Sequence, residues 1–157
     1  FLVLEGNRSL LQQSATRLAG MAEPGLAVRP PLVVGNEEHR FLVLDQLREA
    51  GAEPEQVLLE PEGRNTAPAV TLATLQALAG GADPVLVVTP SDAAITDAPA
   101  YQAALRRAVK RAAAGEIVIL GIRPDRPETG YGYIRAEGAA VAQFVEKPDA
   151  ATAERYL

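Results

Sequence analysis

The chain has 157 residues, of which 15 are basic and 20 acidic, so its formal net charge is −5. This length is typical of one domain, and the acidic balance argues against a sequence-independent nucleic-acid binder, which needs a basic face. The absence of cysteine excludes a disulfide scaffold, a thiol nucleophile and a cysteine-based zinc site. No apolar run approaches the ~20 residues of a membrane span, so we expect no membrane partner and a cytoplasmic protein.

Short apolar runs rich in β-branched residues alternate with longer amphipathic segments through most of the chain. The apolar runs predict strands at residues 31–34, 57–60, 84–88 and 117–120. The amphipathic segments predict helices at residues 36–51, 66–78 and 99–114. This order predicts a Rossmann-like α/β fold, in which a mostly parallel sheet carries helices on both faces.

The last part of the chain follows a different pattern. Residues 131–135 and 140–145 are strand-like and are joined by a short turn around Gly138, so they predict an antiparallel pair added to the sheet. Residues 150–157 begin a helix, whereas residues 1–4 start in the middle of a strand-like pattern. We therefore expect one domain that is truncated at both ends.

The residues that follow each strand are candidates for a site, because ligands of open α/β sheets bind beyond the carboxyl ends of the strands. Glu60 ends the second predicted strand, where a carboxylate can accept two hydrogen bonds from a planar base. Guanine offers such a pair of donors and adenine does not. Asn65 or Thr66 can cap the following helix, whose N-terminus favours phosphate. The alternative is an ordinary Pro/Gly turn with a helix cap and a solvated Arg64.

A second candidate is Asp92, which closes the sequence Thr89-Pro90-Ser91-Asp92 after the most hydrophobic predicted strand. An Asp at this place can hold Mg²⁺, which takes one or two protein carboxylates together with substrate phosphates. The alternative is a helix or turn cap, since Ser and Asp are frequent capping residues. His39, the only histidine, lies in the first turn of a predicted helix, where we expect it to be solvated rather than a general base.

A third candidate group lies on the predicted antiparallel pair. Gly130 and Gly132 belong to its first strand region, and glycines let a ligand approach the backbone closely. Glu146 and Lys147 end its second strand, where Glu146 can accept hydrogen bonds from sugar hydroxyls and Lys147 can neutralise a phosphate. The alternative is a surface charge pair before the turn residue Pro148.

Taken together, these groups have the order and spacing found in the sugar-phosphate nucleotidyltransferases. The chain most resembles the bacterial mannose-1-phosphate guanylyltransferases among them, and the similarity covers essentially its whole length. The segments that carry the resemblance are residues 8–13, 34–41, 60–69, 90–92, 130–134 and 144–148. The run 63–69 is the most specific, and it favours mannose/guanine members over glucose/thymidine members.

The resemblance implies an enzyme that transfers GMP from GTP to mannose 1-phosphate, giving GDP-mannose and pyrophosphate. In this reaction a phosphate oxygen of mannose 1-phosphate attacks the α-phosphorus of GTP. Such chemistry depends on positioning and charge neutralisation more than on a general base, which agrees with a site that lacks His and Cys. The resemblance implies that Glu60 and Pro61 line the guanine pocket and that Arg64 and Asn65 lie beside the nucleotide.

For the metal and the sugar phosphate, the resemblance implies that Asp92 is the Mg²⁺ ligand. It implies that Gly132 and Glu146 contact the mannose and that Lys147 binds its phosphate, so Asp92 and Lys147 are the catalytic candidates. GTP and mannose 1-phosphate are the expected partners. The oligomeric state, including a homodimer, stays open.

Two departures from the family pattern affect this prediction. The family's Gly-rich phosphate-binding loop would precede a segment such as residues 1–4, so we expect residues 1–157 to form a partial nucleotidyltransferase domain, without that loop or the C-terminal part and with little activity alone. Ala93 stands where the subfamily usually has His after Pro-Ser-Asp, which we expect to lower metal affinity or rate. Two alternatives follow: a non-catalytic paralogue that binds a nucleotide sugar and regulates a partner, or a nucleotidyltransferase for another sugar 1-phosphate or base.

Overall fold

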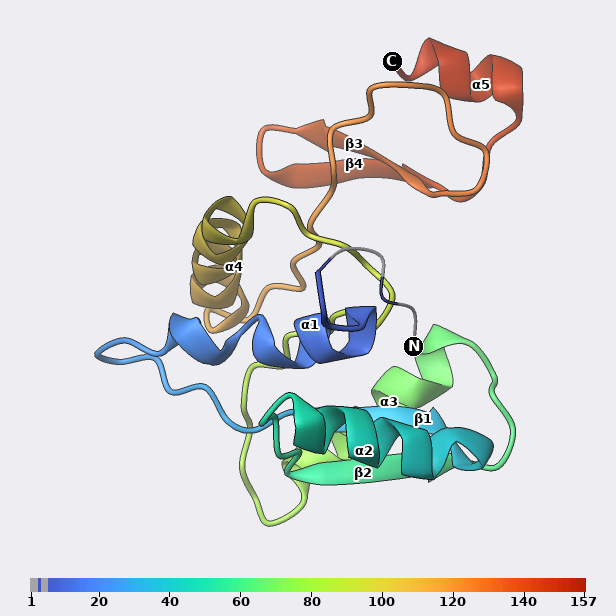
Figure 1. Cartoon of the computed structure of the whole chain (residues 1–157). Coiled ribbons are helices and arrows are strands. Elements are labelled where there is room, and N and C mark those ends of the chain that lie inside the picture. The colour runs from blue at the N-terminus through green and yellow to red at the C-terminus, as the bar shows by residue number, and fades with distance from the viewer. Residues whose placement is uncertain (1–2, 4–5) are drawn as a thin grey trace. The chain divides into compact units, whose positions relative to one another are not determined.

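The computed structural model describes Val3 and residues 6–157 (Figure 1). The chain divides into two compact units, the first unit (Phe1–Val118) and the second unit (Ile119–Leu157). Apart from Val3, the strand-like start at residues 1–4 lies outside the described residues. No helix in the described part of the chain has both the length and the apolar character needed to cross a membrane.

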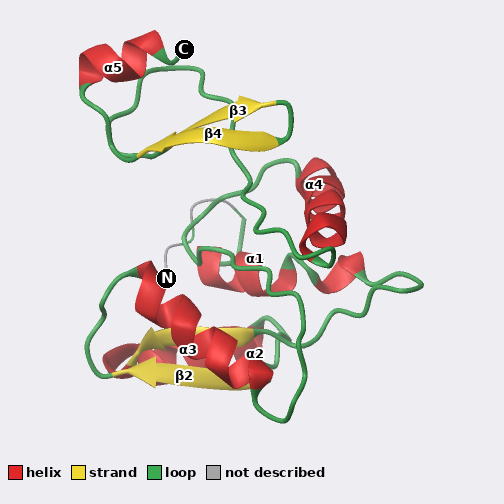
Figure 2. Ribbon diagram, turned by 180° about the vertical axis from the view of Figure 1, so that it is seen from behind, coloured by secondary structure: helices red, strands yellow, loops and turns green. Residues whose placement is uncertain are grey.

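The first unit is built on a pair of parallel strands with a helix on each face (Figure 2). In chain order its elements are α1 (Leu10–Thr16), the 3₁₀ turn η1 (Ala19–Met21), β1 (Leu32–Asn36), the 3₁₀ turn η2 (Glu37–His39), α2 (Arg40–Glu49), β2 (Gln56–Glu60), α3 (Thr66–Leu78) and α4 (Ala98–Ala112). The helices α2 and α3 lie on opposite faces of β1 and β2. This arrangement confirms the predicted α/β class.

The predicted helices are present, with changes at their ends. α3 has the predicted bounds, whereas α4 begins one residue earlier than predicted, at Ala98, and ends at Ala112. Asp97 caps α4 by accepting a hydrogen bond from Ala100 N at 2.9 Å. The predicted helix at 36–51 divides into η2 and α2. Asn36 caps η2, as expected, by accepting a hydrogen bond from Glu38 N at 2.8 Å.

Two predicted strands, at residues 84–88 and 117–120, are instead segments without strand pairing among the described residues. The physical reason is that a strand needs a neighbour to pair with its backbone N–H and C=O groups, and apolar composition alone does not supply one. The side chains reflect the missing cover, because Val88 is 59% and Ile117 98% exposed. The parallel sheet of the described residues is therefore smaller than predicted.

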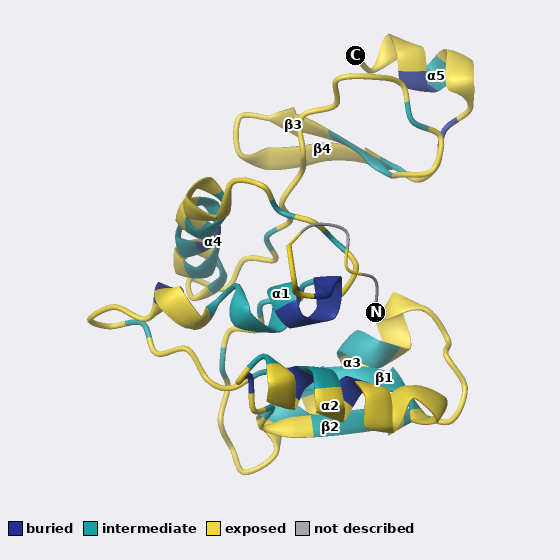
Figure 3. Ribbon diagram, viewed as in Figure 1, coloured by how far each residue is buried: buried dark blue, intermediate teal, exposed yellow. Residues whose placement is uncertain are grey.

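Buried apolar side chains of the first unit gather where α1 packs against α2 (Figure 3). Leu11 of α1 belongs to one cluster with Val43 and Leu47 of α2, and Leu47 is 0% exposed. Val33 of β1 packs against the same cluster. The core thus ties both helices to the strand pair.

α1 has no counterpart among the predicted elements. It begins with a capping box, in which the Ser9 hydroxyl accepts a hydrogen bond from Gln12 N and the Gln12 side chain accepts one from Ser9 N. Gln12 Nε2 also donates to the Gln46 carbonyl at 3.0 Å and to Glu49 at 3.1 Å, both on α2. The Ser-x-x-Gln spacing is a helix-start signal, so the sequence carries a marker for this helix.

The second unit confirms the predicted antiparallel pair, but among the described residues the pair forms a two-stranded sheet of its own and is not added to the parallel sheet. It contains β3 (Tyr133–Glu137), β4 (Ala140–Val145) and α5 (Ala150–Arg155). The turn uses Gly138 with a φ of +63°, a conformation that glycine adopts without strain. Asp149 caps α5 by accepting a hydrogen bond from Thr152 N at 2.7 Å, and this bond holds the pKa of the Asp149 carboxyl below its ordinary value.

Replacing Leu47 by Ala tests the packing of α1 on α2. The substitution removes a fully buried side chain, so we expect the free energy of unfolding of the natural protein to fall by about 2–5 kcal/mol. Leu42→Ala, on the same helix at a position 44% exposed, is the matched control and costs about 1 kcal/mol or less. Urea unfolding measures both values, and equal losses would contradict the assigned core.

Candidate functional site

The paired ends of β1 and β2 form the first part of the candidate site. Glu60, the last residue of β2, is half-buried and lies opposite Asn36, the last residue of β1. Ligands of parallel sheets bind beyond this end of the strands. The Glu60 carboxylate therefore belongs to the edge on which a ligand of this sheet would sit.

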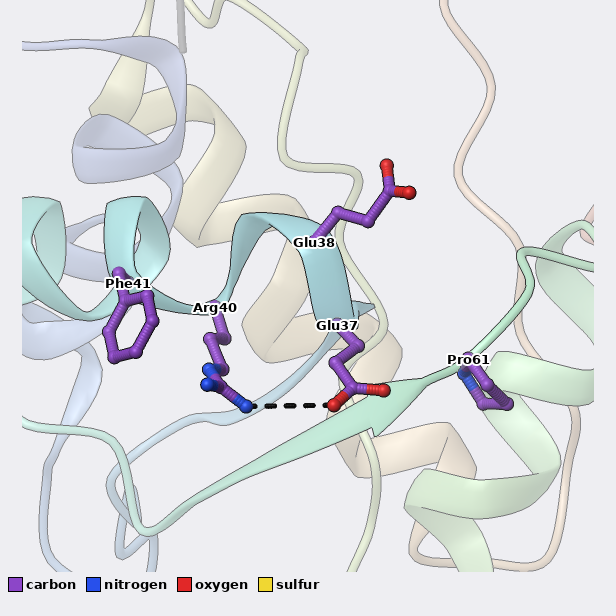
Figure 4. Close-up of a pocket in the computed structure, with 5 residues that line it drawn as sticks. All are labelled: Glu37, Glu38, Arg40, Phe41 and Pro61. Atoms are coloured by element: carbon purple, nitrogen blue, oxygen red, sulfur yellow. Dashed lines mark ion pairs between the residues drawn. The ribbon is translucent and has the colours of Figure 1, made fainter.

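A cavity of about 430 Å³ lies beside this edge, lined by Glu37, Glu38, Arg40, Phe41 and Pro61 (Figure 4). The Arg40 guanidinium pairs with Glu37 at 3.5 Å and lies 4.4 Å from the centre of the Phe41 ring. An exposed aromatic ring beside a guanidinium offers a stacking surface for a planar group. Pro61 is the one predicted site residue in this lining. The other four lining residues follow β1 and were not predicted from the sequence. The rule that ligands lie beyond strand ends applies to them as well and would have found them.

The loop between β2 and α3 carries the other predicted nucleotide-binding residues. Arg64 pairs with Glu62 at 3.0 Å, and both side chains are exposed. Asn65 occupies the N-cap position of α3 but makes no capping hydrogen bond through its side chain. Its φ of 66° and ψ of −170° fall in a region that is strained for a residue other than glycine. Such strain is concentrated at functional sites in proteins, and here it leaves the first N–H groups of α3 without the expected Asn65 cap.

Asp92 lies on an exposed turn that follows the extended segment 84–88. Within the described part of the chain, no hydrogen bond or ion pair engages its carboxylate, and the N-cap of the next helix is Asp97 rather than Asp92. No group of three or more His, Cys, Asp or Glu side chains gathers among the described residues. An unengaged carboxylate of this kind fits a hard divalent cation that takes its remaining ligands from phosphates and water.

In the second unit, Gly132, Glu146 and Lys147 lie together beside the strand pair. A Cβ atom on Gly132 would stand 2.5 Å from Cζ of Phe144 and 2.8 Å from Oε2 of Glu146, so a larger residue here requires both of these exposed side chains to move. Lys147 has a φ of 44°, and its backbone N donates to the Tyr131 carbonyl at 3.2 Å. Its Nζ atom lies 3.7 Å from Oε1 of Glu146, with both side chains exposed. The structure thus places a carboxylate and an ammonium group close to Gly132, and the side chains of Phe144 and Glu146 lie against the glycine itself.

Comparisons with known proteins place these features in a family. A sequence model of the family described as nucleotidyl transferase matches residues 1–157. The chain is 51% identical to the xanthan biosynthesis protein XanB of Xanthomonas campestris pv. campestris (strain B100), over 100% of this chain and 33% of that protein. It is 46% identical to a mannose-1-phosphate guanylyltransferase of Klebsiella pneumoniae, over 100% of this chain and 34% of that protein.

A third relative is the alginate biosynthesis protein AlgA of Pseudomonas aeruginosa (strain PAO1), which is 46% identical over 100% of this chain and 33% of that protein. The chain spans about a third of the length of the curated relatives it matches. No solved structure matches the chain significantly. The similarity therefore rests on sequence.

Replacing Gly132 by Ala tests the close packing in the second unit. The added methyl group meets the Phe144 ring and the Glu146 carboxylate, and moving these exposed side chains is expected to lower the free energy of unfolding by about 1 kcal/mol. Gly130→Ala is the matched control, because a Cβ atom there has nothing within 4 Å. Thermal unfolding of the two variants in the natural protein decides the matter, and a Gly132→Ala protein as stable as Gly130→Ala would refute the packing.

Proposed function

The chain belongs to the nucleotidyl transferase family, and from this premise we propose that the protein transfers GMP from GTP to mannose 1-phosphate, forming GDP-mannose and pyrophosphate. The observation that carries the proposal is the 46% identity, over the whole of this chain, to proteins named mannose-1-phosphate guanylyltransferase. Those names support an enzyme and give no support to a non-catalytic regulator.

In this proposal Glu60 recognises guanine. Its carboxylate accepts hydrogen bonds from guanine N1–H and the exocyclic amine, a donor pair that adenine lacks. Pro61 lines the base pocket, and Arg64 and Asn65 border the nucleotide on the loop that leads into α3. The N–H groups at the start of α3 favour phosphate because they carry the positive end of the helix dipole.

Nucleotidyl transferases generally use a divalent metal, and we propose Mg²⁺, held by Asp92. Bound Mg²⁺ neutralises phosphate charge and orients the α-phosphate for attack. Lys147 binds the phosphate of mannose 1-phosphate, while Glu146 and Gly132 contact the sugar. A phosphate oxygen of mannose 1-phosphate forms a bond to the α-phosphorus as the bond from that phosphorus to pyrophosphate breaks. Because the attacking oxygen is already an anion, no side chain of the protein has to remove a proton.

The proposed substrates also suggest where the reaction takes place. GTP and mannose 1-phosphate carry several negative charges and do not cross a bilayer unaided, so we place the reaction in the cytoplasm. A homodimer is compatible with this proposal, which does not require one.

Pyrophosphate release by the natural protein tests the reaction. We expect release with GTP, mannose 1-phosphate and Mg²⁺ together, and none when one of them is omitted. Asp92→Asn removes a charge from the metal ligand, so we expect kcat to fall by about 10²-fold or more. Asp83→Asn, at an exposed position before the segment 84–88, is the matched control and keeps wild-type activity. A folded wild-type protein that releases no pyrophosphate would refute the proposal.

Replacing Glu60 by Gln tests guanine recognition. The amide loses one acceptor, so we expect kcat/KM for GTP to fall about 10- to 100-fold, since hydrogen bonds to charged groups contribute about 1.5–3 kcal/mol. Activity with ATP does not fall, because adenine lacks the donor pair that the carboxylate accepts. Glu53→Gln, at an exposed position ahead of β2, serves as the control. An unchanged preference for GTP over ATP in Glu60→Gln contradicts the assigned role.

A further inference from the structure

The turn that carries Asp92 is held by Ser14 of α1 and by Arg17, the C-cap residue of that helix, rather than by its own carboxylate. The Ser14 hydroxyl donates a hydrogen bond to the Pro90 carbonyl at 3.1 Å. Arg17 Nη2 donates one to the Ala93 carbonyl at 2.7 Å. These two hydrogen bonds hold the backbone on either side of Asp92, so the segment that carries its carboxylate is fixed at both ends.

Arg17 is itself fixed by α4. Its guanidinium lies 5.6 Å from the centre of the Tyr101 ring, and its carbonyl accepts a hydrogen bond from Gln102 Nε2 at 2.9 Å. Its Nη1 atom is buried and has no hydrogen-bond partner among the described residues. The Tyr101 ring and the Gln102 hydrogen bond hold Arg17 where its Nη2 atom reaches the Ala93 carbonyl.

Ser14 has an equally restricted environment. It is 8% exposed, and its hydroxyl lies 3.3 Å from the Thr89 hydroxyl as well as within reach of the Pro90 carbonyl. The helix that carries Ser14 is bound to α2 by the hydrogen bonds of Gln12 and begins with its own capping box. The Ser14 contacts with the Asp92 turn therefore come from a helix that is itself held in place by α2.

We propose that Ser14 and Arg17 are positioning residues, which set the place of the Asp92 carboxylate by holding the backbone of its turn. The inference rests on the proposed role of Asp92 as the metal ligand. Its physical basis is that an exposed carboxylate without contacts of its own has no other means of being oriented. Loss of either contact lets the turn move, and a displacement of about 1 Å at a reacting centre costs up to ~10²-fold in rate.

We expect Ser14 and Arg17 to affect metal binding and the chemical step, but not the recognition of GTP. Glu60 belongs to β2, which the backbone ladder with β1 holds in place, and none of the contacts of Ser14 or Arg17 reaches that strand. Weakening the Asp92 turn should therefore leave GTP recognition intact. A general loss of folding would instead reduce every property together.

The test compares Ser14→Ala, Arg17→Met and Arg17→Lys in the natural protein. Arg17→Met keeps the length of the side chain and removes its donors, whereas Arg17→Lys keeps a charge and a donor able to reach a carbonyl. Arg107→Met, at an exposed arginine on α4, is the matched control. Circular dichroism and thermal unfolding establish that each variant is folded, and Ser14→Ala, the smallest change, decides the matter if Arg17→Met does not fold.

Binding of Mn²⁺ to the protein is measured first, by the EPR signal of the free ion in the absence of mannose 1-phosphate, so that no turnover occurs. A sample of Mn²⁺ and GTP without protein is the blank, because GTP itself binds the ion. We expect Arg17→Met and Ser14→Ala to weaken Mn²⁺ binding about tenfold or more, with partial recovery in Arg17→Lys. We expect the Mg²⁺ concentration for half-maximal activity to rise in parallel and kcat to fall. The KM for GTP at saturating Mg²⁺ stays within about twofold of wild type, in contrast to the effect of Glu60→Gln.

Mn²⁺ binding equal to wild type in the folded variants would overturn the positioning role. The proposed function is judged separately, by the activity of the wild-type protein. An inactive wild type whose Mn²⁺ binding still weakens in Arg17→Met refutes guanylyl transfer and supports the positioning role. An active wild type whose Mn²⁺ binding does not respond to any of the substitutions refutes the positioning role alone.

Discussion

Parallel pairing of β1 with β2 sends both strands toward the same edge of the sheet, so the residues that follow them share one surface of the first unit. An antiparallel pair would place Asn36 and Glu60 at opposite edges. The cavity that takes part of its lining from Phe41 after β1 and part from Pro61 after β2 is a direct consequence. Parallel pairing in turn needs a crossover connection, which here is α2, and the buried Leu47 holds that helix in the core.

A ligand-binding side chain must be accessible, and accessibility removes the contacts that would otherwise orient it. In this structure, hydrogen bonds to the backbone hold the segment, while the charged side chain stays exposed. Asp92 is exposed, yet Ser14 of α1 and the C-cap residue Arg17 donate hydrogen bonds to the Pro90 and Ala93 carbonyls of its turn. In the second unit, the backbone N of Lys147 is bonded to Tyr131 while the ammonium group stays exposed. In both places hydrogen bonds hold the backbone while the charged side chain stays exposed.

Signals that act over a few residues could be predicted from the sequence. The Gly138 turn of the hairpin and the cap of η2 by Asn36 follow from local chemistry, because each depends on residues one to four positions away. The capping box of α1 is a signal of the same kind that the hydrophobic periodicity did not reveal. The predicted site residues were found by the same local rule, that of residues following strands.

The sequence by itself determined the α/β class and the family resemblance, because side-chain periodicity, turn chemistry and motif spacing are properties of neighbouring residues. The site residues that it nominates remain predictions. The tertiary structure decided which apolar runs become strands, since residues 84–88 need a paired neighbour that their own composition cannot provide. It also decided that Ser14 and Arg17 hold the Asp92 turn. Those contacts join residues 76 positions apart, and only the packing of α1 in the folded first unit brings them within hydrogen-bond distance.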